Sequence, residues 1–250
     1  MNVVIITGAS SGIGREFALQ LDAGLYTVDE FWLIARREER LEELAARLDH
    51  MAKVIPMDLT SDADMDHFRN LLKKERPVIR MLINSSGYGM MGNFNRLGRQ
   101  EQLGMLDINC RALTDMTYAC IPYMKRKSRI IMMASSAAFL PQPGLLSMRP
   151  AKLILSLSGS ARGAWPGGNL CTVCPGPAWD RIFEKAEKHE DTLAIKKYSM
   201  VEAEDVVRSA LTASARNQGM SVYSPLIKGL HLLTKVVPHG VLLGVVQKMK

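Results

Sequence analysis

Short runs of β-branched and aliphatic residues alternate with longer amphipathic stretches along most of this chain. Runs typical of buried strands lie at residues 3–7, 31–35, 53–57, 78–83, 129–134 and 170–174. Helical patterns lie between and after them, at residues 12–21, 37–48, 62–74, 101–125, 150–162 and 204–216, and a short strand is predicted at 220–224. This alternation predicts an α/β protein with one doubly wound parallel sheet flanked by helices on both faces. Because ligands of such sheets bind beyond the carboxyl ends of the strands, functional residues are expected in the loops that follow the strands.

The length and composition bound the class of protein without choosing a ligand. The 250 residues suit one large domain with a well-buried core. A net charge of +7 is compatible with an anionic ligand, a nucleic acid or a membrane surface. The basic run Lys125–Arg129 is predicted to end a helix, where cations complement the helix dipole, so we expect no nucleic-acid partner. The five histidines are scattered without ligand spacing, and no metal site is predicted.

Both ends of the chain and its cysteines bear on its location. Met1 leads directly into NVVIITG without a charged region or cleavage site, which predicts no signal peptide and a cytoplasmic location. The apolar stretch VVPHGVLLGVV is too short and too interrupted to span a bilayer. Cys171 and Cys174 lie three residues apart on a predicted strand, where their side chains face opposite ways. We therefore expect buried free thiols rather than a redox pair.

The glycine-rich segment TGASSGIG follows the first predicted strand and opens the first predicted helix. Glycines at positions 8, 12 and 14 let a backbone approach a pyrophosphate, and the helix N-terminus offers it free N–H groups. No Lys–Ser/Thr pair follows the last glycine, which excludes a Walker A loop. The segment therefore predicts a dinucleotide site.

Taken with four later motifs in order, this segment resembles the short-chain dehydrogenase/reductase family from about residue 3 to residue 216. The later motifs are MDLTS with Asp58, INSSG from Asn84 to Gly87, LDINC with Asn109, and CPGPA after the sixth strand. The resemblance implies a Rossmann-like NAD(P)-binding domain. It also implies a set of cofactor-binding residues: Thr7, Gly8, Ser10, Ser11, Gly12, Ile13, Gly14, Arg36, Asp58, Asn84, Gly87, Lys152, Pro175 and Gly176.

The end of the second strand indicates which nucleotide the site prefers. An acidic residue there is typical of NAD sites, whereas a basic residue matches the 2′-phosphate of NADP. This chain has Arg36 and Arg37, and a planar guanidinium suits a phosphate, so NADP(H) is the predicted cofactor. The alternative is that these arginines open a solvated helix and pair with glutamates 38–43. That alternative fits Arg37 better than Arg36, which stands first after the strand.

The family's proton donor is the point at which the resemblance fails. Members of the family donate a proton from a Tyr that stands four residues before a Lys, and a Ser about thirteen residues upstream of the Tyr binds the carbonyl oxygen. Here Lys152 and Ser135 are present, with Ser136 as the adjacent candidate, but Met148 stands in the Tyr position. A thioether has no proton to donate. The resemblance gives Asn109 the role of anchoring a proton-relay water.

Neighbouring positions do not restore the donor. The enoyl-reductase spacing places Leu145 where a Tyr would stand, and Pro150 restricts where the helix around Lys152 can begin. Asp180 replaces a Thr that the family uses to hold the nicotinamide amide. Tyr88, just after INSSG, is the best substitute donor, although ordinary packing is the favoured role for it.

Two hypotheses follow for the whole chain. The first is an NADP(H)-dependent oxidoreductase of a carbonyl or alcohol, weak or atypical in its proton source. The second is a non-catalytic NADP(H)-binding protein that acts as a sensor or partner subunit. Under both, residues 1–250 form a single domain, with a substrate-cleft segment at 177–200 and an apolar C-terminal extension at 226–250. The resemblance implies a small-molecule substrate and assembly as a homodimer or homotetramer.

Overall fold

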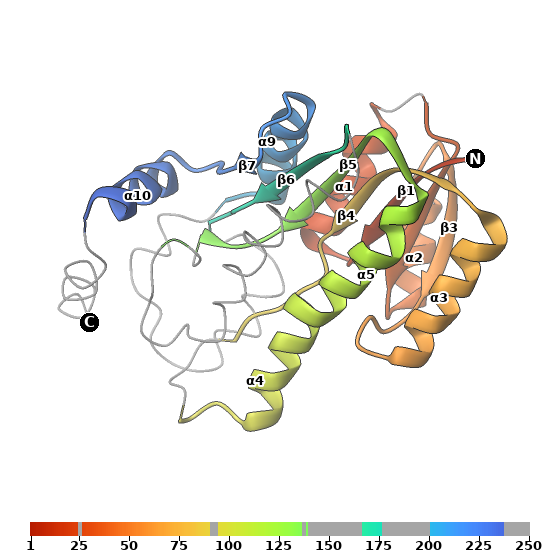
Figure 1. Ribbon diagram of the computed structural model, residues 1–250, viewed down its shortest axis with the longest axis horizontal. Coiled ribbons are helices and arrows are strands. Elements are labelled where there is room, and N and C mark those ends of the chain that lie inside the picture. The colour runs from red at the N-terminus through yellow and green to blue at the C-terminus, as the bar shows by residue number, and fades with distance from the viewer. Residues whose placement is uncertain (25–26, 91–94, 137–138, 140–166, 177–200, 238–250) are drawn as a thin grey trace.

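The computed structural model describes residues 1–24, 27–90, 95–136, 139, 167–176 and 201–237 (Figure 1). These residues contain a seven-stranded sheet with the order β3-β2-β1-β4-β5-β6-β7. Its strands are β1 (Asn2–Thr7), β2 (Glu30–Ala35), β3 (Met51–Pro56), β4 (Val78–Asn84), β5 (Met124–Met133), β6 (Asn169–Val173) and β7 (Met220–Ser221). Every neighbouring pair is parallel, and the order reverses direction at β1 and β4. The predicted doubly wound parallel sheet is therefore confirmed.

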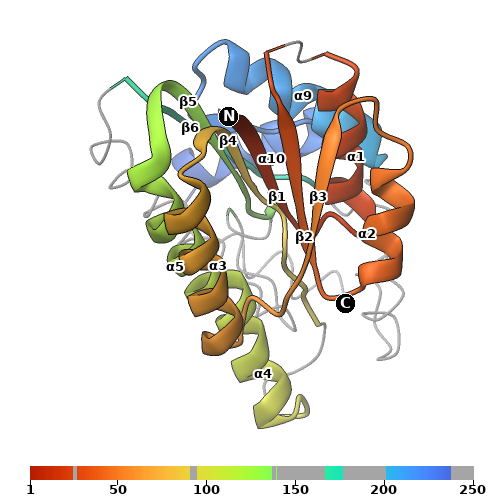
Figure 2. The same ribbon diagram turned by 90° about the vertical axis from the view of Figure 1, so that its right-hand side faces the viewer.

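Helices cover both faces of the sheet, as Figure 2 shows edge-on. One layer holds α1 (Gly12–Asp22), α2 (Glu38–Ala45) and α9 (Ala203–Ala215). The other holds α3 (Asp62–Glu75), α4 (Arg99–Leu106) and α5 (Leu113–Cys120). The last described helix, α10 (Pro225–Val236), lies beyond β7 (Figure 1). It occupies the first half of the C-terminal segment predicted to be apolar.

The two helical layers have separate apolar cores because successive strand residues point to opposite faces. Val3 and Ile5 of β1 pack with Phe68 of α3, whereas Val4 and Ile6 pack with Phe17 of α1. All six of these side chains are fully buried. A strand buried on both faces reads as a continuous apolar run, which is why β1 has no polar alternation.

The long helix predicted at residues 101–125 is wrong as a single element. The chain forms α4, then a π-helix, η1 (Asp107–Ala112), then α5, and a 3₁₀ turn, η2 (Ile121–Tyr123). The basic run also differs from prediction, because it lies inside β5 rather than at a helix end. There the register shifts, Lys127 takes a φ of 69°, and the Ser128 hydroxyl bonds Lys125 N–H and Ile79 C=O. The basic run therefore forms a bulge in β5, and the two hydrogen bonds of the Ser128 hydroxyl hold it together.

Several further predictions can be placed. Cys171 and Cys174 are buried thiols that form no disulfide, as predicted, and they lie in different apolar clusters. Burial raises the pKa of the Cys174 thiol to about 12. Within the described residues, no helix combines the length and the hydropathy that a bilayer crossing requires. The helix predicted at 150–162 and the cleft segment at 177–200 lie outside the described residues.

Candidate functional site

The carboxyl ends of four neighbouring strands bring the predicted site loops to one edge of the sheet. Thr7 at the end of β1 is in register with Asn84 at the end of β4, and Asn84 in turn with Met132 of β5. On the other side, Thr7 is in register with Ile34 of β2. The sequence-distant motifs therefore meet at this edge, as the topology of a parallel sheet requires.

The glycine-rich turn is packed too closely for side chains at two of its glycines. A Cβ on Gly14 would stand 2.4 Å from the carbonyl oxygen of Gly8. Gly8 has a φ of 70°, and a Cβ there would stand 3.0 Å from the backbone of Ser85. Ser11 is the N-cap of α1 but makes no capping hydrogen bond among the described residues, so the first-turn N–H groups lack that partner. The turn thus brings bare backbone and a helix N-terminus together.

Thr7 ties this turn to the loop after β4. Its hydroxyl oxygen accepts the N–H groups of Ser85 and Ser86 at 3.1 and 3.2 Å, and Thr7 is only 1% exposed. Asn84 is 2% exposed, and its side-chain amide donates to the hydroxyl of Thr117 in α5 at 2.9 Å. These buried bonds fix the spacing between the turn, the β4 loop and α5.

Two arginines after β2 lie in different places. The Arg37 guanidinium donates to the hydroxyls of Ser10 and Ser11 at 2.9 and 3.2 Å, so it sits over the glycine-rich turn. Arg36 is largely exposed, and its Nη1 lies 3.8 Å from Oδ2 of Asp58. The sequence pattern favoured Arg36 as the residue that binds the 2′-phosphate, and it indicated a surface position for Arg37. The direction of Arg37 was missed because nothing local in the sequence specifies it.

Asp58, after β3, is held as a carboxylate. Burial by itself raises the pKa of this group, but the hydroxyl and N–H of Thr60 and the charge of Arg36 outweigh it, so the pKa lies below its usual value. Both Thr60 groups donate to Oδ1, at 2.7 and 2.8 Å. The other oxygen, Oδ2, faces Arg36.

Asn109 lies in the π-helix η1 and holds the loop after β4. Its amide nitrogen donates to the carbonyl of Tyr88 at 2.8 Å, and its amide oxygen accepts the Tyr88 N–H at 3.1 Å. A Cβ on Gly87 would stand 2.6 Å from that same amide oxygen, so a larger residue there would have to displace the Asn109 amide. Single π turns often occur at functional sites, where they redirect one side chain.

The Tyr88 side chain turns toward α4. A Cβ on Gly104 would stand 2.6 Å from its hydroxyl, so the two are in close contact. Burial raises the pKa of Tyr88, with Glu101 and Asp107 adding to the rise and Arg36 opposing it. A phenol with a raised pKa is a weaker acid, so this geometry favours a packing role for Tyr88 over proton donation.

The loops after β5 and β6 lie against each other. Ser135 is half-buried just beyond β5, and the N–H of Ser136 donates to the carbonyl of Pro175 at 2.9 Å. Pro175 and Gly176 are buried. The predicted carbonyl-binding serine and the predicted CPG loop are therefore neighbours.

Not every predicted site residue can be located. Met148, Lys152, Pro150 and Asp180 lie outside the described residues, so their predicted roles stay predictions. Ile13 of the glycine-rich turn packs its side chain against the core on the α1 face.

A doubly wound sheet with this glycine-rich turn at its carboxyl edge is the architecture of dinucleotide-binding domains. The family model for the short chain dehydrogenase matches residues 2–153. The chain belongs to the short-chain dehydrogenase family.

Relatives and solved structures agree with this membership. A very-long-chain 3-oxoacyl-CoA reductase of Phaeosphaeria nodorum is 33% identical over 172 residues, which cover 64% of this chain and 49% of that protein. A short-chain dehydrogenase of Sphingobium yanoikuyae in complex with NADPH has a TM-score of 0.78 at 23% identity, covering 95% of this chain and 97% of that one. A family member from Burkholderia phymatum in complex with NAD has a TM-score of 0.79 at 19% identity, covering 93% and 92%. The chain thus spans about half the length of the fungal relative.

Proposed function

We propose that this chain binds NADP(H) at the carboxyl edge of its sheet and acts as an oxidoreductase of a carbonyl or alcohol substrate. The observation that carries the proposal is the tight backbone contact of Gly8 with Gly14 beneath the Arg37 guanidinium. Such a turn leaves room for a pyrophosphate and provides a positive charge beside it.

The residues at this edge fit a nicotinamide nucleotide. The turn from Thr7 to Gly14 would hold the pyrophosphate, Asp58 the adenine, and Arg36 with Arg37 a 2′-phosphate. Gly87, Pro175 and Gly176 would flank the nicotinamide, and Lys152 would bind its ribose. A bound nicotinamide nucleotide supplies or accepts the hydride.

The names of similar proteins support the general part of this proposal, which is a nicotinamide-dependent oxidoreductase. The two solved neighbours hold NADPH and NAD, so they favour a nicotinamide nucleotide without choosing between its forms. The fungal relative is named as a reductase of a 3-oxoacyl thioester, which makes that class of carbonyl the first to test. The choice of NADP(H) rests on the two arginines of this chain.

In the oxidoreductase reading, the chain's own residues hold the substrate carbonyl. Ser135 would donate a hydrogen bond to its oxygen, and Lys152 would keep a positive charge nearby. With Met148 in the family's Tyr position, no positioned phenol provides the proton. Because losing a general acid costs about 10²- to 10⁴-fold in rate, turnover should be slow. Met148 is also what favours the second candidate, a non-catalytic NADP(H)-binding protein.

The nucleotide part is tested by titrating the full chain with NADPH and with NADH. We expect NADPH to bind more tightly, and Arg36→Ala and Arg37→Ala each to reduce that preference, because each removes a phosphate partner. Arg40→Ala, in the first turn of the helix α2 that follows these arginines, is the matched control and should leave the preference unchanged. Lys152→Ala should weaken NADPH binding. Equal affinities for both nucleotides in the wild type contradict the choice of NADP(H).

The catalytic part is tested with a panel of carbonyl substrates that includes a 3-oxoacyl thioester. Met148→Tyr should raise reduction by about 10²-fold if the phenol reaches the position the family uses. If Pro150 displaces the helix start, only Met148→Tyr with Pro150→Ser should recover rate. No turnover in any of these variants, with NADPH still bound, supports the non-catalytic reading. Wild-type turnover as fast as that of an ordinary family member means that another proton donor acts.

A further inference from the structure

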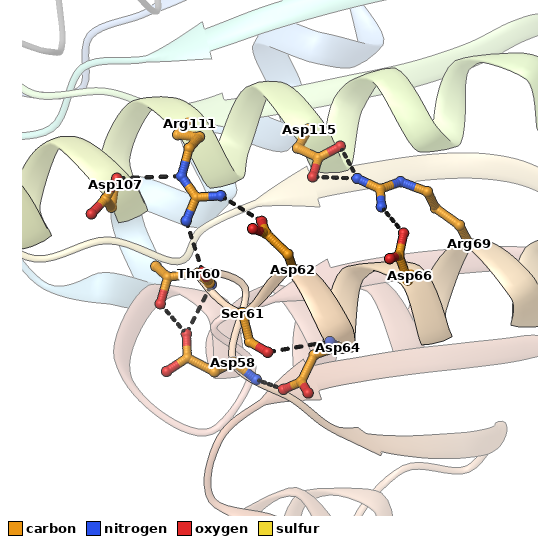
Figure 3. Close-up of polar contacts among 10 residues, drawn as sticks. All are labelled: Asp58, Thr60, Ser61, Asp62, Asp64, Asp66, Arg69, Asp107, Arg111 and Asp115. Atoms are coloured by element: carbon orange, nitrogen blue, oxygen red, sulfur yellow. Dashed lines mark hydrogen bonds and ion pairs between the residues drawn. The ribbon is translucent and has the colours of Figure 1, made fainter.

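Arg111 joins the π-helix η1 to the loop after β3 (Figure 3). Its Nη2 donates to the carbonyl of Thr60 at 2.7 Å, and its Nη1 donates to Oδ1 of Asp62 at 2.9 Å. Its Nε reaches Asp107, one turn earlier on its own helical segment, at 3.3 Å. One guanidinium therefore connects two elements that are far apart in sequence.

The loop that Arg111 holds is the one that presents Asp58. Thr60 donates both its hydroxyl and its N–H to Oδ1 of Asp58, so the position of Thr60 sets the rotation of that carboxylate. Asp58 N–H donates to Asp64 at 2.7 Å, which fixes the other side of the loop (Figure 3). With one carboxylate oxygen occupied by Thr60, Asp58 can offer Oδ2 to a ligand.

The fixed geometry of the guanidinium explains why arginine suits this position. Its planar fork can donate to a backbone carbonyl and to a carboxylate at the same time, which the single ammonium group of lysine does less well. Asp62 and Asp107 both favour the charged form, and the pKa of Arg111 lies above its usual value through its hydrogen bond to Asp62. Arg111 thus stays charged at any physiological pH.

We propose that Arg111 is a positioning residue for the adenine end of the nucleotide site, acting through Thr60 on Asp58. The inference rests on the proposed nucleotide function and extends it to a residue that does not itself reach the ligand. Asn109, two residues earlier on η1, makes its own bonds to Tyr88 and does not depend on Arg111 for them. The effect of Arg111 should therefore be confined to the adenine half.

Arg69 supplies a matched control. It also joins two elements, helices α3 and α5, donating to both oxygens of Asp115 at 2.5 and 2.6 Å and to Asp66 at 2.6 Å (Figure 3). Among the described residues, Arg69 makes no hydrogen bond or ion pair to the Asp58 loop. Removing Arg69 therefore weakens the same helical layer without disturbing Thr60.

The experiment measures NADPH affinity by fluorescence titration, and the affinities of 5′-AMP and nicotinamide mononucleotide by competition against it. Wild type, Arg111→Met, Arg111→Lys and Arg69→Met are compared as full chains. In Arg111→Met, the affinities for NADPH and 5′-AMP should fall by about fivefold, the scale of one ordinary hydrogen bond, with nicotinamide mononucleotide unchanged. Arg111→Lys should recover part of the loss, and Arg69→Met should bind all three as the wild type does.

The outcomes separate this inference from the proposed function. NADPH binding by the wild type with no change in Arg111→Met overturns the role of Arg111 and leaves the proposed function intact. Equal losses for 5′-AMP and nicotinamide mononucleotide, or an equal loss in Arg69→Met, mean that Arg111 only supports the fold. If the wild type binds no nucleotide, the proposed function fails and this inference fails with it.

Discussion

Polar groups make different kinds of contact at the two edges of the sheet. At the amino edge, buried charges face one another: Asp22, 9% exposed, accepts the N–H groups of Asp49 and His50 and the ring nitrogen of His50. Beside it, Glu30 accepts the Trp32 indole N–H at 2.6 Å and lies 3.7 Å from the Lys53 ammonium. At the carboxyl edge, the polar groups instead position backbone and side chains around the glycine-rich turn.

This difference separates stability from function within one fold. A charge enclosed by its own partners can lower the free energy of the folded state but offers little to a ligand. Under the proposed function, a carboxylate such as Asp58, with one oxygen held by Thr60 and the other 3.8 Å from Arg36, should contribute less to folding and more to recognition. Substitutions at the amino edge should therefore change stability alone, and those at the carboxyl edge should change nucleotide affinity.

The largest effect is expected from Gly14→Ala at the carboxyl edge. The new Cβ would meet the Gly8 carbonyl, which is backbone and can move only by opening the turn. We expect NADPH affinity to fall by tenfold or more. The free energy of unfolding should fall by about 1–3 kcal/mol. Calorimetric titration and urea unfolding measure the two quantities.

Gly24→Ala is the control for that substitution, because a Cβ there has only an ordinary contact of 3.5 Å with Gln20. It should leave both NADPH affinity and stability close to wild type. Full NADPH affinity in Gly14→Ala contradicts the place given to the turn.

Asp22→Asn should destabilise the protein by about 1.5–3 kcal/mol at neutral pH, the scale of hydrogen bonds to a charged group, without changing nucleotide affinity. Burial raises the pKa of Asp22, but the N–H groups of Asp49 and His50 and the His50 ring bring it below its usual value. A lowered folded-state pKa means that the carboxylate stabilises the fold above about pH 4 and that this contribution is lost as pH falls through the folded-state pKa.

The pH dependence of unfolding in urea checks the Asp22 prediction. The difference between wild type and Asp22→Asn should shrink as the pH is lowered below about 4, because the wild type then loses its carboxylate. A difference that stays constant well below pH 4 would show that the charge of Asp22 is not what stabilises the amino edge.

The smallest effect is expected from Lys53→Met at the amino edge. Lys53 bonds Glu75 at 2.5 Å, approaches Glu30, and lies 4.8 Å from the centre of the Trp32 ring. Its loss should cost about 1 kcal/mol, because the pair is partly exposed. Lys73→Met, at an exposed position of α3, should cost nothing measurable by thermal unfolding. A change in NADPH affinity in Lys53→Met would contradict the assignment of stability to the amino edge and of nucleotide binding to the carboxyl edge.

Much of the fold could be predicted from local sequence patterns, and the carboxyl-edge loops followed from the topology. Strand–helix alternation is a local signal, and a parallel sheet brings all its strand ends to one edge. The division of residues 101–125 could not be predicted, because α4, η1 and α5 share one continuous apolar pattern. The π-helix accompanies the contacts of Asn109 with Tyr88 and of Arg111 with Thr60, which are tertiary.

Long-range side-chain contacts account for the rest of what the sequence missed. Arg37 reaches Ser10 across 27 positions, and His50 reaches Asp22 across 28. No periodicity records such pairs, and the direction of Arg37 follows from its place as the N-cap of α2 beside the glycine-rich turn. The role predicted for Arg36 stays a prediction, while the structure adds Arg37 as a direct neighbour of the turn.

Amide hydrogen exchange with and without saturating NADPH tests most directly whether the carboxyl edge is the nucleotide site. The account predicts slower exchange in the segments around Gly8 to Gly14, Arg37, Asp58 to Thr60 and Ser85 to Tyr88. The amino-edge amides of Asp49 and His50, which already bond Asp22, should exchange at unchanged rates. Protection at the amino edge, or none around the glycine-rich turn while NADPH is bound, would contradict the account.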